Sequence, residues 1–124
     1  MNTLINTVIF SSFIMSVIPY SKFEEGFNSN SPKLIIEGSK EKIMLNVLGV
    51  EGVYSKAQAE LILKDFFNKK PNGNFRFIFK GKESNEETFA IGTYETDQET
   101  FRVTFQFKNQ NENYSLESLA IEKN

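Results

Sequence analysis

The sequence contains no cysteine, no histidine and no tryptophan, and it has only three prolines. Without cysteine the chain can form neither a disulfide nor a thiolate zinc site or redox centre. Without histidine it lacks the commonest general base, which excludes Ser-His-Asp catalysis and histidine metal sites. The chain has instead thirteen phenylalanines in 124 residues, which is typical of a single domain with a substantial hydrophobic core.

The chain also lacks an excess of positive charge. Its formal net charge is −2, from 14 lysines and arginines against 16 acidic residues, and the basic residues are scattered. The densest basic cluster, Lys64, Lys69 and Lys70, is interrupted by Asp65 and is typical of a solvated helix surface. A nucleic-acid partner is therefore not expected, because phosphate binding needs basic residues gathered on one face.

The N-terminus carries an apolar run without any charged residue, Leu4–Ile18. This run is shorter than the about 20 residues that span a bilayer, and it suits the apolar region of a signal peptide. Ser16 is small enough to precede a cleavage point, and Pro19 prevents the helix from continuing unchanged. We therefore expect a signal peptide at 1–17, export to the periplasm or outside the cell, and no stable membrane insertion after cleavage. The alternative is a buried first helix of a domain that would otherwise span 18–124.

Three helices are predicted in the first half of the domain. Phe23 and Phe27 are four residues apart and share a helical face. A second, short helix begins after a cap and a proline at Asn30–Pro32, and Gly38 ends it. Ser55 and Gln58 form a capping box, and a third helix follows with its apolar residues at helical spacing. Between the last two helices we expect one strand, residues 43–48, and then a loop at Gly49 and Gly52.

The second half alternates with a period of two residues and predicts a four-stranded meander. In the first three of these strands we expect the apolar face to begin with Phe75, Phe89 and Phe101, respectively. The last strand, residues 114–121, breaks its alternation at Leu116 and Leu119, which indicates a bulge. One face of this sheet is aromatic and has to be covered, and the three helices are the elements that can cover it. The predicted fold is α+β: three N-terminal helices packed on a strongly bent antiparallel sheet, in the order ααβαββββ.

This order is the pattern of the nuclear-transport-factor-2-like (NTF2-like) cone, which belongs to the cystatin-like folds. Local motifs strengthen the likeness, and together they resemble domain-of-unknown-function family 4783, small exported proteins of the Bacteroidota. The residues that carry the resemblance are Gly52–Lys56, Ala59–Phe67, Phe89–Thr93, Phe101–Val103 and Ile121–Lys123. The resemblance covers the chain from about Ile18 to Lys123 and implies the fold and an exported location. It implies no activity.

Catalysis is not expected. Some NTF2-like relatives are isomerases or dehydratases that use a buried Asp, His or Tyr. Here both aspartates, Asp65 and Asp97, are expected on the surface, and Glu117 is the one carboxylate whose alternation places it with apolar residues. We predict no catalytic residue, no metal and no cofactor.

Two sets of residues are candidates for binding. A small apolar ligand in the cone would meet Tyr54, Phe77, Thr93 and Phe105, although Tyr54 could also pack against the first turn of the third helix. A homodimer or other partner would meet the opposite sheet face, at Arg76, Tyr94, Arg102 and Gln106, although this face could also be simply solvated. The candidate functions are therefore a small-molecule or partner-binding module, a homodimeric protein–protein interaction domain, and, least expected, a cone-pocket isomerase or hydro-lyase.

Overall fold

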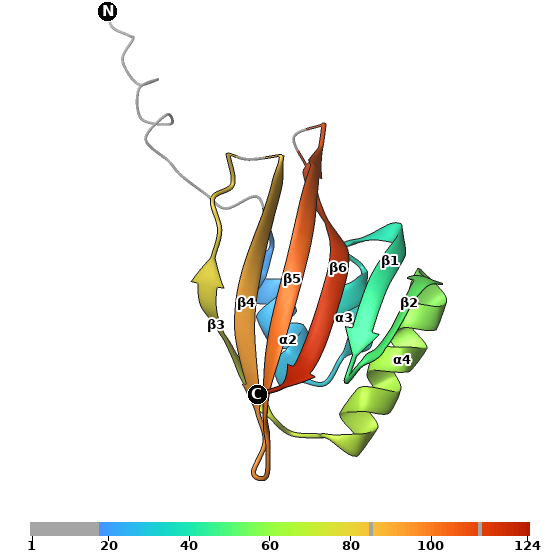
Figure 1. The fold of residues 1–124 in the computed structure, drawn as a ribbon, viewed down its shortest axis with the longest axis vertical. Helices are drawn as coiled ribbons and strands as arrows, with labels where there is room; N and C mark the ends of the chain where they lie inside the picture. Colours follow the sequence, from blue (N-terminus) through green and yellow to red (C-terminus); the bar gives the residue numbers. More distant parts are fainter. Residues whose placement is uncertain (1–17, 85, 112) are drawn as a thin grey trace, which may run out of the picture.

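The computed structural model describes residues 18–124, apart from residues 85 and 112. The predicted signal peptide therefore lies outside the described residues. The helices are α2 (Tyr20–Asn28), α3 (Pro32–Ile36) and α4 (Lys56–Lys69) (Figure 1). The strands are β1 (Ser39–Val47), β2 (Val50–Ser55), β3 (Asn74–Lys80), β4 (Glu87–Glu95), β5 (Thr100–Gln110) and β6 (Asn113–Lys123).

All six strands form one sheet in the order β2-β1-β6-β5-β4-β3. The last four strands are neighbours in chain order, so the predicted meander is confirmed. The predicted bulge is confirmed as well, because Leu116 pairs with Phe107 while Ser118 pairs with Gln106. The prediction of a wholly antiparallel sheet is wrong, since β1 runs parallel to β6.

Strand β2 was not expected, so the observed order is ααββαββββ rather than ααβαββββ. Leu48 and Gly49 both have positive φ, 53° and 91°, and they turn β1 tightly back into β2. Two consecutive residues of positive φ are the signature of the type I′ hairpin turn. The predicted loop is therefore a hairpin, and Gly52 lies inside a strand.

The three predicted helices are confirmed, and local capping explains two of their boundaries. The hydroxyl of Ser31 accepts a hydrogen bond from the amide of Leu34, and Pro32 occupies the first turn of α3. At α4 the capping box is complete, because Ser55 accepts from the amide of Gln58 and the Gln58 side chain accepts from the amide of Ser55.

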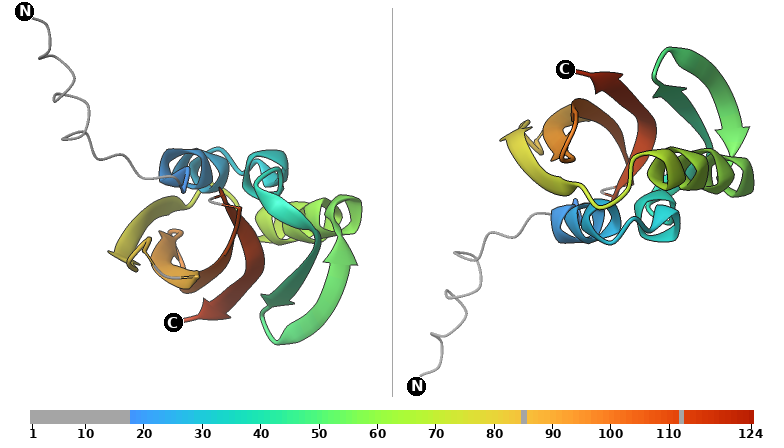
Figure 2. Two further views of the ribbon diagram at one scale, coloured as in Figure 1. Left: turned by 90° about the horizontal axis from the view of Figure 1, so that it is seen from above. Right: turned by 90° about the horizontal axis from the view of Figure 1, so that it is seen from below.

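The core lies on the concave face of the sheet, which curves around α2 with α3 and α4 alongside (Figure 2). Rings from the helices pack directly on rings from the strands: Phe23 lies 5.3 Å from Phe105, Phe27 lies 4.7 Å from Phe75, and Phe66 lies 5.3 Å from Phe101, between ring centroids. Burying each large side chain contributes about 1.5–3 kcal/mol. The prediction that helices cover an aromatic sheet face is confirmed.

Strand β4 presents the opposite face from the one predicted. Ala90 and Tyr94 are fully buried, and Gly92 is buried between them, whereas Phe89 is 45% exposed. The small residues point inward because rings from β3 need the room: a Cβ on Gly92 would lie 2.3 Å from the Phe75 ring. In β3 a bulge between Phe77 and Phe79 turns Phe79 outward, so its predicted inward placement is also wrong.

The buried phenol of Tyr20 gives the domain an alkaline dependence of stability. Its hydroxyl has no hydrogen-bond partner among the described residues, and burial, followed by nearby Glu83 and Tyr114, raises the pKa of Tyr20 to about 12 from 10.0. The unfolded chain ionises this phenol first, so stability is complete below pH 10 and is lost as the pH rises toward about 12.

We expect Tyr20→Phe to reduce this loss by on the order of 1 kcal/mol, and to be neutral or stabilising at pH 7 because it removes an unpaired buried hydroxyl. Urea unfolding of both proteins across this alkaline range measures the difference. Equal losses of stability in the two proteins would contradict the assignment to Tyr20.

Candidate functional site

A groove opens between the β1–β2 hairpin and the C-terminal half of α4, and we call it the hairpin groove. It encloses about 340 Å³, which lies within the usual range of small-molecule pockets of roughly 300–1,000 Å³. Most of its walls are aliphatic or aromatic, and the charged residues come from α4 and its C-terminal end. The lining residues are Val47, Leu48, Val50, Tyr54, Ile62, Asp65, Phe66, Lys69 and Lys70.

The helical face of α4 explains the apolar wall of the hairpin groove. Leu63, Phe66 and Phe67 are buried in the core. Ile62, one residue before Leu63, is only half-buried and lines the groove instead. The preceding Leu61 is 65% exposed and is absent from the groove lining.

The hairpin turn forms one rim of the groove. Leu48 lines the groove with a side chain that is 46% exposed, and its φ of 53° is unusual for a large residue without a polar group. Its amide donates a 2.9 Å hydrogen bond to the carbonyl of Ile121 in β6, which holds the turn in place. Backbone strain of this kind is common at binding sites.

Tyr54 is the groove-lining residue that carries a hydroxyl. Its ring lies across Gly52, where an added Cβ would sit 2.5 Å from the phenol oxygen, so a larger residue at that position would require the ring to move. The sequence motif Gly52–Lys56 is thus in part a requirement of the ring of Tyr54. Among the described residues, the Tyr54 hydroxyl has no hydrogen-bond partner and is free to donate and to accept.

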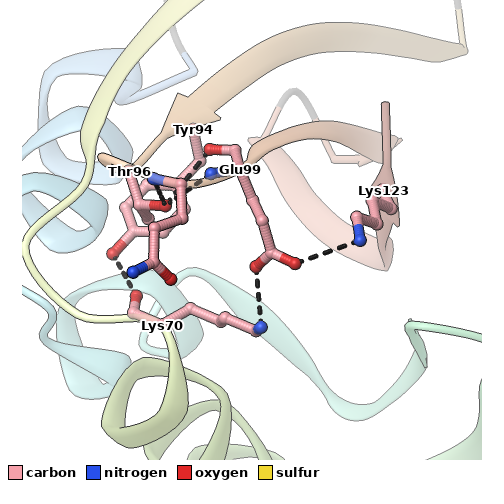
Figure 3. A network of polar contacts seen from close by, with 6 residues as sticks. Lys70, Tyr94, Thr96, Glu99 and Lys123 are labelled. Carbon is pink, nitrogen blue, oxygen red and sulfur yellow. Dashed lines mark hydrogen bonds and ion pairs between the residues drawn. The ribbon is translucent and has the colours of Figure 1, made fainter.

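The charges at the end of the groove are paired (Figure 3). The ammonium of Lys70 lies 2.6 Å from one carboxylate oxygen of Glu99, and Lys123 lies 3.2 Å from the other. Hydrogen bonds from Lys70 and Lys123 hold the pKa of Glu99 below its ordinary value, so this carboxylate stays ionised at neutral pH. On the helix, Lys69 lies 3.2 Å from Asp65.

A second hollow, of about 410 Å³, continues the hairpin groove beyond Lys70. Leu48 and Lys70 line both hollows, and Glu99, the ion-pair partner of Lys70, lines the second one. The second hollow adds Phe101, Glu122 and Lys123 to the walls. The ammonium of Lys70 also lies 6.0 Å from the centre of the Phe101 ring, where the ring face attracts a cation.

The four residues predicted to bind a ligand are not brought together. Tyr54 lines the hairpin groove. Phe105 is fully buried in the core, and Phe77 packs against it with ring centroids 5.1 Å apart. Thr93 lies on the outer face of β4, so its predicted place inside the cone is wrong. The reason is the same as for Phe89: the inner face of β4 carries the small residues that leave room for the rings of β3.

Of the four residues predicted at an interface, three lie on the outer sheet face: Arg76, Arg102 and Gln106 are exposed. The predicted exposure of Tyr94 is wrong, because this side chain is fully buried. Its hydroxyl donates to the carbonyl of Lys70 at 2.7 Å, and it accepts from the amide of Gly73 and from the side chain of Asn30, both at 3.0 Å.

Sequence reasoning missed an apolar patch on this outer face. Phe79 and Phe89 are 46% and 45% exposed, and their ring centroids lie 5.1 Å apart. Ile91 pairs with Phe79 across the strands and is half-buried beside them. Ala90 and Gly92 could have indicated this patch in the sequence. They alternate with Phe89 and Ile91, and such small residues suit a crowded inner face better than a solvated outer one.

Acidic residues do not gather in the part of the chain that the structure describes. No group of three or more possible metal ligands occurs within it. Glu117 is half-exposed and lies 3.9 Å from Lys40. None of the described helices is both long and apolar enough to cross a membrane.

Comparison with known proteins identifies the family and the fold. The sequence model of the domain of unknown function DUF4783 matches residues 20–122. A DUF4783 family protein of known structure from Bacteroides ovatus is 25% identical and superposes with a TM-score of 0.78, over 89% of this chain and 98% of that one. A search of the curated proteins finds no match.

More distant structures confirm the type of fold. An NTF2-like protein of unknown function from Shewanella baltica is 8% identical, with a TM-score of 0.66 over 98% of each chain. A domain with a cystatin-like fold from Nostoc punctiforme is also 8% identical, with a TM-score of 0.66 over 85% of this chain and 72% of that one. The fold is thus α+β and NTF2-like, and the chain belongs to the DUF4783 family.

Proposed function

We propose that the domain is an exported, non-catalytic binding module that holds a small, mostly apolar molecule in the hairpin groove. The observation that carries this proposal is an apolar groove of about 340 Å³ with an unpaired phenol hydroxyl, that of Tyr54, in its wall. Ligand sites commonly combine apolar walls with a few polar groups in this way. The strained Leu48 at the rim supports the same location.

A binding role suits the groove better than a catalytic one. Its one lining carboxylate, Asp65, belongs to a residue exposed on α4 and is paired with Lys69. An exposed carboxylate held by a lysine lacks the buried surroundings in which catalytic carboxylates are usually found.

Export is supported by the uncharged run Leu4–Ile18, and the family match begins after it, at residue 20. The intact mass of protein recovered from the envelope of the native cell should lack the segment that ends near Ser16. A mass that still includes this segment would count against cleavage.

The groove is tested by filling it. Protein bearing Ile62→Trp and protein bearing Leu61→Trp are purified from native cells beside the wild type, and solvent extracts are compared by mass spectrometry. Because Ile62 lines the groove and the neighbouring Leu61 does not, we expect a co-purified molecule in the wild type and in Leu61→Trp, and its loss from Ile62→Trp. Thermal melting shows whether the two variants are equally folded. A molecule retained equally by folded Ile62→Trp would place binding elsewhere.

A second candidate function is self-association through the outer sheet face, which the Phe79–Phe89 patch favours. Arg102 on the same face pairs in register with Glu122 of β6, and neither side chain has an ion-pair partner among the described residues. In a two-fold dimer an arginine of one copy can then face a glutamate of the other.

If this face forms a dimer, Arg102→Glu should weaken it by roughly 1–3 kcal/mol. The stability of the monomer should change by no more than about 0.5 kcal/mol, as for other surface substitutions. Sedimentation velocity over a range of concentrations and thermal melting of the same variant measure the two effects. A wild type that stays monomeric at every concentration, or an early-melting variant with unchanged association, would argue against this interface.

A further inference from the structure

The hairpin groove has no charge to offer a ligand. Its lining includes two lysines and one aspartate, and each belongs to an ion pair: Lys69 with Asp65, and Lys70 with Glu99. The adjoining hollow adds Lys123, which shares Glu99, and Glu122, which has no ion-pair partner among the described residues and does not line the hairpin groove itself. Across both hollows three lysines face three carboxylates, and the formal charge is zero.

A charged ligand in the hairpin groove itself would have to compete with these ion pairs. An anion that binds Lys70 displaces Glu99, whose side chain is only 18% exposed, and leaves that carboxylate with Lys123 as its one remaining partner. A cation that binds Glu99 displaces Lys70 or Lys123 in the same way. Removing one partner of a partly buried charge is costly, so either exchange reduces the affinity.

Of the polar side chains that line the groove, that of Tyr54 is the one without a partner among the described residues. A phenol hydroxyl both donates and accepts a hydrogen bond. It can therefore bind an alcohol, a carbonyl, an ester or an amide without any change of charge. The apolar side chains around it, from Val47 and Val50 to Ile62 and Phe66, match an alkyl chain or ring.

We infer that the hairpin groove selects an uncharged amphiphile, with an apolar chain or ring and one hydrogen-bonding group held by Tyr54, over acids and amines of the same size. This inference rests on the proposed binding function and adds the chemical class of the ligand.

Three probes with the same alkyl chain test the inference: octanol, octanoate and octylammonium. Each is titrated at pH 7 into isotope-labelled residues 18–124, and the backbone amide shifts of the groove residues are followed by NMR. We expect octanol to bind at least about tenfold more tightly than either charged probe, because only octanol leaves both ion pairs intact. Tyr54→Phe should weaken octanol binding by about fivefold, the loss of one hydrogen bond.

The outcomes separate the two proposals. Tighter binding of octanoate or octylammonium than of octanol would overturn the inference, and so would octanol binding that Tyr54→Phe leaves unchanged. Either outcome would still leave a ligand site in the groove. Two outcomes would overturn the proposed function itself. One is that none of the three probes shifts the amide signals of the groove residues. The other is that octanol shifts these signals in Ile62→Trp as much as in the control Leu61→Trp.

Discussion

Phe105→Ala is expected to lower the free energy of unfolding by about 3–5 kcal/mol, the usual loss when a fully buried phenylalanine is truncated. Phe105 lies at the centre of the aromatic core and is completely buried. Its ring centroid lies 5.3 Å from that of Phe23, 5.1 Å from that of Phe77 and 5.9 Å from that of Phe27. Alanine leaves a cavity among three elements that cannot all close in to fill it.

Phe89→Ala is the matched control, since Phe89 is also a strand phenylalanine but is 45% exposed on the outer face of the neighbouring strand. We expect it to cost less than about 1 kcal/mol, because much of its surface is already in water. Urea unfolding of both variants measures the difference. Similar losses for the two variants, or a loss below about 1 kcal/mol for Phe105→Ala, would show that the two sheet faces are assigned wrongly.

The alternation of the sequence predicts β5 correctly because every second residue of that strand is large and apolar. Phe101, Val103, Phe105 and Phe107 are all buried, with Arg102 and Gln106 outside, as expected. The same rule fails in β4, where both faces carry apolar residues and the larger ones, Phe89 and Ile91, were taken as the inner set. Steric room decides that strand: the Phe75 ring occupies the space where a Gly92 side chain would be.

Strand β2 escaped prediction for a related reason. Gly49 and Gly52 looked like two halves of one loop, yet Gly49 serves the turn at φ 91° while Gly52 makes room for the ring of Tyr54. A glycine that makes room for the ring of a nearby residue looks the same in sequence as a glycine that turns the chain. Residue preferences likewise do not predict a leucine, here Leu48, at a turn position with positive φ.

The candidate site was predictable only at one residue. Tyr54 was singled out for its position before the α4 cap, and it lines the hairpin groove. Ile62 and Lys70 come from the helix, and Leu48 comes from the hairpin that was missed. A groove between two elements needs both elements in place, so a sequence that conceals β2 also conceals the groove.

Tyr94→Phe is expected to lower the free energy of unfolding by about 2–3 kcal/mol, although it removes a single oxygen atom. The hydroxyl of Tyr94 joins three segments: it donates to the carbonyl of Lys70 at the end of α4, and it accepts from the amide of Gly73 and the side chain of Asn30 (Figure 3 shows the contact with Lys70). Gly73 is buried against the same ring, where a Cβ would lie 2.5 Å away. Phenylalanine leaves the amide of Gly73 without its partner, and an unpaired buried group costs about 1–3 kcal/mol.

Tyr54→Phe is the matched control, because its hydroxyl has no partner among the described residues and its loss should cost no more than about 0.5 kcal/mol. Urea unfolding of the two variants compares a phenol that ties α4 to the sheet with the phenol of a residue that lines the groove. Since Tyr94 also fixes the backbone of Lys70, Tyr94→Phe should loosen the Lys70–Glu99 ion pair, and the amide shifts at the end of α4 should move. Equal stability of Tyr94→Phe and Tyr54→Phe would mean that water replaces the lost bonds, and that the end of α4 is held by the packing of Phe66 and Phe67 instead.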